Sequence, residues 1–138
     1  MRQHLHHLAV TTAGQDLVDI TASIRQWVTA QRAGTGLLTI WCRHTSASLL
    51  VQENADPDVR ADLLAFFRRL VPEGTQYRHQ DEGADDMPAH IKSALTQSQL
   101  TIPVEHGAPV LGTWQGIYLF EHRAAPHRRD LVLHLLCD

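Results

Sequence analysis

The sequence has no apolar segment as long as a membrane helix requires. Such a helix needs about 20 consecutive apolar residues, and every apolar run here is shorter. The first residues, MRQHLHHLAVTT, also lack the apolar core of a signal peptide. We therefore expect a cytoplasmic protein with no membrane partner.

Cysteine and net charge are also scarce. The two cysteines, Cys42 and Cys137, lie in separate apolar runs and form no C-x-x-C pair, which favours buried, reduced thiols. The formal net charge is -3 and the sequence pI is about 6.3, so the basic excess typical of nucleic-acid-binding domains is absent. We expect no nucleic-acid partner.

No repeat, low-complexity tract or flexible linker divides the chain. Its 138 residues and 43% apolar content fit a single domain, residues 1–138, that can bury a core without disulfides or a structural metal. Apolar patterning predicts strands over residues 3–11 (extended by 17–20), 37–43, 48–53, 100–104, 112–121 and 131–135. The segment 37–43 carries apolar residues on both faces of the expected strand, so we expect it to be central and buried on both faces. We interpret Trp114 as a core residue rather than a stacking platform.

Three helices are predicted between these strands. The first is capped by Thr21 and carries Ile24, Trp27 and Val28 at helical spacing. The second begins at Asp56, Pro57 and Asp58, a good helix start, and has an apolar stripe formed by Val59, Leu63, Phe66, Phe67 and Leu70. The third is short, is capped by Asp86 and carries Ile91, Ala94 and Leu95. The fold class is α+β, a largely antiparallel, β-sandwich-like sheet system with about three helices.

Two polar segments interrupt this pattern. Residues 43–48 (RHTSAS) follow a buried strand, and their consecutive hydrogen-bonding side chains indicate either an ordinary loop or a ligand or metal site. The long polar loop 73–85 contains His79 and leads to Asp86 and His90, which are four residues apart. On a helix that spacing brings two side chains to one face, where they could share a metal ion or act as an acid/base pair. Alternatively, Asp86 only caps the helix and His90 only pairs with it.

A third polar group is basic. Arg123 follows Glu121 and His122, and Arg128 and Arg129 follow a predicted turn. Arginine side chains there could bind phosphate oxygens, or they could simply be the solvated end of a hairpin.

Four blocks of the sequence, in this order, resemble the YjbQ family (secondary thiamine-phosphate synthase family). They are HTSASLLVQENADPDVRADL, DEGADDMPAHIKSAL, SQLTIPVEHG and GTWQGIYLFEHR, and they span most of the chain from about Gly36 to Arg129. The resemblance implies an α+β fold with a β-sandwich-like core and assembly as a homotrimer. It also implies recurring polar site positions, which fall here at His44, Asn54, Asp56, His79, Asp86, His90 and Gln115.

The resemblance further implies a weak thiamine-phosphate synthase activity. That reaction joins an aminopyrimidine methyl diphosphate to a thiazole phosphate and releases pyrophosphate, so the substrates are small phosphorylated molecules. We expect His44, Asp86 and His90 to be catalytic. We expect substrate contacts from Arg43, Thr45, Ser46, Asn54, Gln115 and Arg128.

A divalent metal is a further expectation, with His44, His79 and His90 as ligands. Histidines favour zinc, whereas a diphosphate would bring magnesium. Three functions therefore stay open: the synthase, a metal-dependent hydrolase of a phosphorylated small molecule, and a non-enzymatic trimer that binds a ligand or metal.

Overall fold

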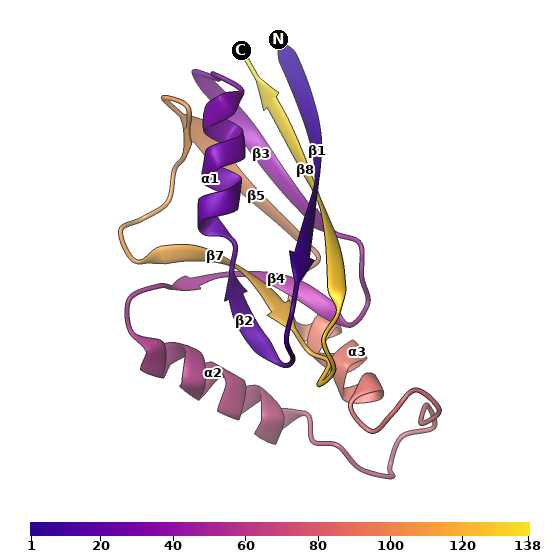
Figure 1. Ribbon diagram of the computed structural model, residues 1–138. Coiled ribbons are helices and arrows are strands. Elements are labelled where there is room, and N and C mark those ends of the chain that lie inside the picture. Colours follow the sequence, from indigo (N-terminus) through magenta and orange to yellow (C-terminus); the bar gives the residue numbers. More distant parts are fainter.

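The computed structural model describes residues 1–138 as two antiparallel sheets with helices against them (Figure 1). The five-stranded sheet has the order β1-β8-β3-β5-β6, and the three-stranded sheet has the order β2-β7-β4. The α+β class with three helices is confirmed. The strands are β1 (Arg2–Thr11), β2 (Asp16–Asp19), β3 (Thr35–Cys42), β4 (Ala47–Glu53), β5 (Gln99–Glu105), β6 (Ala108–Pro109), β7 (Gln115–Glu121) and β8 (Arg128–Cys137), and the helices are α1 (Thr21–Ala30), α2 (Pro57–Leu70) and α3 (Asp86–Leu95).

The main core lies between the inner face of the five-stranded sheet, α1 and one face of the three-stranded sheet. Alternation along β8 turns Leu131, Leu133 and Leu135 inward, and all three are fully buried. Ile24 and Val28 of α1 pack against the same cluster. Cys42 and Cys137 are buried free thiols, as predicted.

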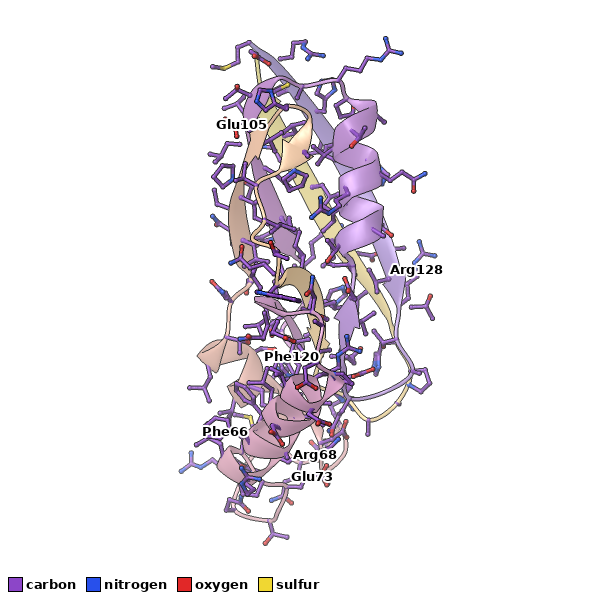
Figure 2. The ribbon with its side chains drawn as sticks, turned by 90° about the vertical axis from the view of Figure 1, so that its left-hand side faces the viewer. Phe66, Arg68, Glu73, Glu105, Phe120 and Arg128 are labelled. Atoms are coloured by element: carbon purple, nitrogen blue, oxygen red, sulfur yellow. The ribbon has the colours of Figure 1, made fainter.

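A smaller core lies on the other face of the three-stranded sheet, beneath α2. Leu17, Tyr118 and Phe120 are buried there against Leu63 and Phe67 of the helix. Phe120 lies against α2, and Figure 2 shows the two together. As predicted, Asp56 caps this helix by accepting a hydrogen bond from the amide of Asp58 (2.9 Å).

Several local predictions are wrong. Residues 16–19 do not extend β1, because they pair with β7 in the other sheet. Thr21 is not a helix cap: its amide and hydroxyl both donate to Asp19. Segment 37–43 is central but buried on one face only, since Leu37 and Trp41 are 44% and 47% exposed.

Three further predictions fail because apolar residues lie at the surface. Phe66 and Leu70 of the predicted α2 stripe are exposed, and so is Leu95 of α3. Trp114 is 63% exposed and is not a core residue.

The predicted cap of the third helix is also wrong by one residue. Asp86 is the first residue of α3 rather than its cap, which is Asp85.

Candidate metal centre

The start of α3 is held by the loop before it and by the end of β7. Gly83 has a positive φ of 107°, a conformation that glycine adopts without strain, and its carbonyl accepts a hydrogen bond from the amide of Asp86. The Asp85 carboxylate makes no cap hydrogen bond, because it accepts instead from Arg123 Nε (2.9 Å) and from the amide of Ala124 (2.8 Å). These contacts fix where Asp86 points.

His79, Asp86 and His90 form a compact cluster. Oδ2 of Asp86 lies 2.6 Å from Nε2 of His79 and 3.2 Å from Nε2 of His90, and the three potential ligand atoms lie within 4.8 Å of one another. The Asp86 side chain is only 6% exposed, whereas that of His79 is 42% exposed. The carboxylate is therefore enclosed while one side of the cluster is open to solvent.

The orientation of His90 is set by the backbone. Its Nδ1 lies 2.8 Å from the carbonyl oxygen of Thr45, which can only accept, so Nδ1 carries a proton. In a neutral imidazole, Nε2 then has a lone pair, and that lone pair faces Asp86 Oδ2, another acceptor. Two acceptors at 3.2 Å require a proton or a metal cation between them. A histidine fixed by an Nδ1–H bond to a carbonyl is also the usual arrangement of a metal-ligating histidine.

Arg123 orients the carboxylates from the other side. Its Nη1 lies 2.8 Å from Asp86 Oδ1, and its Nη2 donates to the carbonyl of Glu82. Burial alone would raise the pKa of Asp86, but the His79 hydrogen bond, Arg123 and His90 together hold that pKa below its usual range. Asp86 is therefore an anion at neutral pH, with Oδ1 occupied by Arg123 and Oδ2 directed to the two imidazoles.

The donor set fits a divalent transition metal. Two imidazoles and one carboxylate with an open side are the ligands of many catalytic zinc sites and of other transition-metal sites. Magnesium prefers oxygen ligands only, so the set does not suit it.

His44 lies beside this cluster but outside it. It lines a shallow surface pocket whose other residues are Thr45, His90, Ser93, Ala94 and Ser98. Its Nε2 accepts a hydrogen bond from the amide of Asp130 (2.7 Å). The structure thus groups His79 and His90 as potential ligands and places His44 next to them without a free Nε2.

Some of the predicted substrate contacts are exposed side chains, whereas Ser46 is buried. Thr45 is exposed and lines the pocket with His90, Arg43 is exposed next to His44 in the chain, and Arg128 is 75% exposed, pointing away from the molecule (Figure 2). Ser46 is buried, where its hydroxyl accepts from Arg129 Nη2 (3.1 Å), so it is a structural hydrogen-bond partner within this chain.

Asn54 and Gln115 are not brought to the cluster. Ala47 pairs with Glu121 and Glu53 pairs with Gln115, so these two residues lie at the far end of the β4·β7 pair (Figure 1). At about 3.4 Å per residue, that end is roughly 20 Å away. Asn54 Nδ2 donates to the carbonyl of Gln115, and the Gln115 side chain accepts from the amide of Gly112.

Arg129 is not a free phosphate-binding residue. Together with Glu121 it forms a buried ion pair, with Arg129 Nε donating to Glu121 Oε1 at 2.8 Å. Thr12 donates to the same oxygen (2.7 Å), and Arg123 donates its amide to Oε2. Alternation along β8 is the pattern that could have revealed this pair, since residue 129 has the inward parity of Leu131.

A buried hydroxyl network lies behind α3. Ser48 Oγ is 2.8 Å from His122 Nε2 and 2.6 Å from the hydroxyl of Thr96. His122 is fully buried, and burial, followed by the nearby Lys92, lowers its pKa to about 3. It is therefore neutral under ordinary conditions.

Together, fold and site define a small α+β protein with two sheets and a candidate His–Asp–His metal centre at the start of α3. Residues 6–138 match the family model described as UPF0047 protein YjbQ-like. The chain belongs to this family.

Sequence similarity to relatives extends over most of this chain and most of each relative. A UPF0047 protein from Synechocystis is 52% identical over 135 residues, covering 97% of this chain and 92% of the relative. The UPF0047 protein YjbQ of Escherichia coli O157:H7 is 46% identical over 112 residues, 81% of each chain. A crystal structure of an uncharacterized conserved protein of the YjbQ/UPF0047 family from Clostridium acetobutylicum has a TM-score of 0.87 at 32% identity, covering 95% of this chain and 99% of that chain. The longest helix, α2, has 14 residues, and none of the three helices could span a bilayer.

Proposed function

We propose that this chain is a metal-dependent enzyme that acts on a phosphorylated small molecule, with His79, Asp86 and His90 holding a divalent transition metal. One observation carries the proposal: Nε2 of His79 and Nε2 of His90 converge on Oδ2 of the ionised Asp86, the three atoms lie within 4.8 Å of one another, and Nδ1 of His90 is bound to the Thr45 carbonyl. Nε2 of His90 and Oδ2 of Asp86, 3.2 Å apart, need a proton or a metal cation between them, and a metal there would be shared by all three side chains. Zinc is the metal that the donor set favours.

The reaction class that this arrangement favours is hydrolysis. A bound metal would supply an activated water and a Lewis acid for the attacked group. The chain's own residues do the positioning. The Thr45 carbonyl fixes the tautomer of His90, Arg123 holds Asp86, and the exposed side of His79 leaves an approach for the substrate.

Two arginines support a phosphorylated substrate. Arg43 adjoins His44 and Arg78 adjoins His79, both side chains are exposed, and neither is in an ion pair. Arg123 and Arg129, by contrast, are already paired with carboxylates. Phosphate recognition would therefore fall to Arg43 and Arg78.

Metal content of the untagged protein tests the proposal. Mass spectrometry should find about one equivalent of zinc in the wild type and almost none in His79→Ala or His90→Ala. His7→Ala, which removes an exposed histidine far along β1, is the matched control and should keep its metal. Equal metal in His90→Ala and wild type would overturn the assignment.

A second candidate is the thiamine-phosphate synthase reaction that the family resemblance implies. The observation favouring it is that two pockets flank the cluster: His79 lines one, together with other residues of the loop before α3, and His90 lines the other. Two pockets would suit two substrate molecules. Pyrophosphate release that depends on magnesium and survives removal of zinc would favour the synthase, whereas activity lost with chelators and restored by zinc or manganese would favour the hydrolase. Ligand-dependent stabilisation without turnover would indicate a binding protein instead.

We also propose assembly as a homotrimer, as the resemblance implies. The outer face of the five-stranded sheet supports it, because Leu37, Trp41 and Leu136 are exposed on neighbouring strands. Exposed apolar patches of this kind commonly mark interfaces. Sedimentation of a monomer at micromolar concentration would contradict the trimer, and Trp41→Glu should weaken it.

A further inference from the structure

His44 has one ring nitrogen whose role the backbone determines. The amide of Asp130 points at Nε2 from 2.7 Å. A backbone amide can only donate, so Nε2 must carry the lone pair in this contact. A neutral His44 therefore has its single proton on Nδ1.

The Nδ1–H group of the half-buried His44 makes no hydrogen bond within the chain, where the ring's one contact is that of Nε2 with Asp130, so Nδ1–H is left for solvent or a ligand. Burial, together with the nearby Arg129, outweighs Asp130 and lowers the pKa of His44, which keeps the ring neutral at physiological pH. The side chain is thus a fixed, unpaired donor rather than a base. This differs from a metal ligand, which would need an available lone pair.

His90 also carries a proton on Nδ1, but there the chain binds Nδ1, whereas in His44 the chain binds Nε2. The Nδ1–H of His90 is taken by the Thr45 carbonyl, so the atom left to the metal is Nε2, which faces Asp86. Both histidines line one pocket, so a ligand bound there would lie beside the His44 ring and next to the His79, Asp86 and His90 cluster. A cation at Nε2 of His90 and an oxygen acceptor at the Nδ1–H of His44 would satisfy both rings.

We propose that His44 is a ligand-binding residue whose Nδ1–H donates a hydrogen bond to an oxyanion, a phosphate or carboxylate group, bound in the pocket that His44 shares with His90. The inference deepens the proposed function and rests on it for the metal, which would hold another oxygen of the same group. It assigns His44 to the substrate and not to the metal.

Two isosteric substitutions separate the ring's two functions. In His44→Asn the side-chain amide nitrogen can take the place of Nδ1, so the donor is kept and the acceptor for Asp130 is lost. In His44→Gln the amide oxygen can take the place of Nε2, so the Asp130 contact is kept and the donor is lost. A structural role of His44 would favour Gln, whereas the proposed binding role favours Asn.

Titration of inorganic phosphate into cobalt(II)-loaded protein, followed by visible absorption, measures the effect. Phosphate affinity should be similar for the wild type and His44→Asn and about tenfold weaker for His44→Gln, the cost expected for losing a hydrogen bond to a charged group. Cobalt uptake should be the same in all three. Equal phosphate affinity in the wild type and His44→Gln would overturn the proposal.

The tautomer is tested without any metal. Two-bond proton–nitrogen correlation spectra of the metal-free protein should show His44 protonated at Nδ1 only, and protonation at Nε2 would overturn the inference. If the wild type takes up no cobalt, the proposed metal centre fails. Calorimetric titration of phosphate into the metal-free protein then tests the role of His44 by itself. The expected order is unchanged: similar phosphate affinity in the wild type and His44→Asn, and weaker affinity in His44→Gln.

Discussion

Two carboxylate clusters lie close to each other, and they are built in opposite ways. Glu121 is fully buried, and Arg129, Thr12 and the amide of Arg123 donate to its two oxygens. These contacts hold its pKa below the usual range although burial raises it. Asp86 is also paired with an arginine, since its Oδ1 lies against Arg123, but its Oδ2 faces two imidazoles at a partly open surface.

The difference separates stability from binding. Both carboxylate oxygens of Glu121 accept hydrogen bonds from inside the chain, so that cluster joins β7 to β8 and offers no free carboxylate oxygen to a ligand. In the Asp86 cluster, by contrast, two imidazole nitrogens converge on one carboxylate oxygen at a partly open surface, an arrangement that can hold a cation. A carboxylate whose two oxygens are bonded deep inside the chain predicts a role in folding, and one that gathers potential metal ligands at an open surface predicts a role in binding.

The largest expected effect is on the buried Glu121 cluster. Arg129→Met should lower the free energy of unfolding by about 3–5 kcal/mol, because it leaves the Glu121 carboxylate buried without its partner. The double variant Glu121→Leu with Arg129→Met should recover most of that loss. Urea denaturation measures both, and a loss below about 1 kcal/mol for the single variant would remove the distinction between the clusters.

The open cluster should respond to metal instead. At a free zinc concentration 100 times the dissociation constant, binding should stabilise the wild type by about 2.7 kcal/mol. His90→Ala should abolish this gain and change the metal-free unfolding midpoint little, because His90 is only half-buried. A large drop in metal-free stability in His90→Ala and also in His44→Ala would show that these histidines are structural.

His122 gives a smaller, pH-dependent effect. Its folded pKa is about 3, lowered first by burial and then by Lys92, whereas an unfolded histidine has a pKa of about 6.5. Between these values the unfolded chain binds one more proton, so stability falls by about 1.4 kcal/mol for each pH unit as the pH decreases. His122→Gln should remove that part of the slope, measured by urea denaturation between pH 4 and 6 as a rough window.

His7→Gln is the control for this slope. His7 is exposed, so its removal should leave the pH dependence of unfolding unchanged. An unchanged slope in His122→Gln would mean that His122 is not held neutral in the fold.

The smallest expected effect belongs to a site outside both clusters. Asp56→Ala should destabilise the protein by about 1 kcal/mol through loss of the α2 cap. Asp56→Ser retains an oxygen acceptor and should lose much less. Thermal unfolding with no difference between the Ala and Ser variants would contradict the cap assignment.

Much of the fold could be predicted from local pattern. Alternation identified β5 and β8, and Asp56 before Pro57 identified the start of α2. The i, i+4 spacing of Asp86 and His90 correctly placed both on one helical face. These predictions succeed because each depends on residues that are neighbours along the chain.

Predictions that depend on pairing between distant strands were less successful. The β4·β7 register places Gln115 opposite Glu53, which separates Asn54 and Gln115 from His90 within one chain. The donor that fixes His44 is a backbone amide, Asp130, to which side-chain identity gives no clue. The second role of Arg123, orienting Asp86, likewise depends on tertiary contact.

The two ends of the chain lie side by side, since Arg2 pairs with Cys137 in the β1·β8 ladder (Figure 1). A short linker could therefore join residues 138 and 1, and new termini could be opened in the exposed loop between Tyr77 and Asp86. Opening that circular permutant just after His79 would cut the covalent connection between His79 and α3 while retaining every strand pairing. Such a molecule would keep its fold, and its metal affinity would report how much the continuity of the loop contributes to holding the first ligand in place.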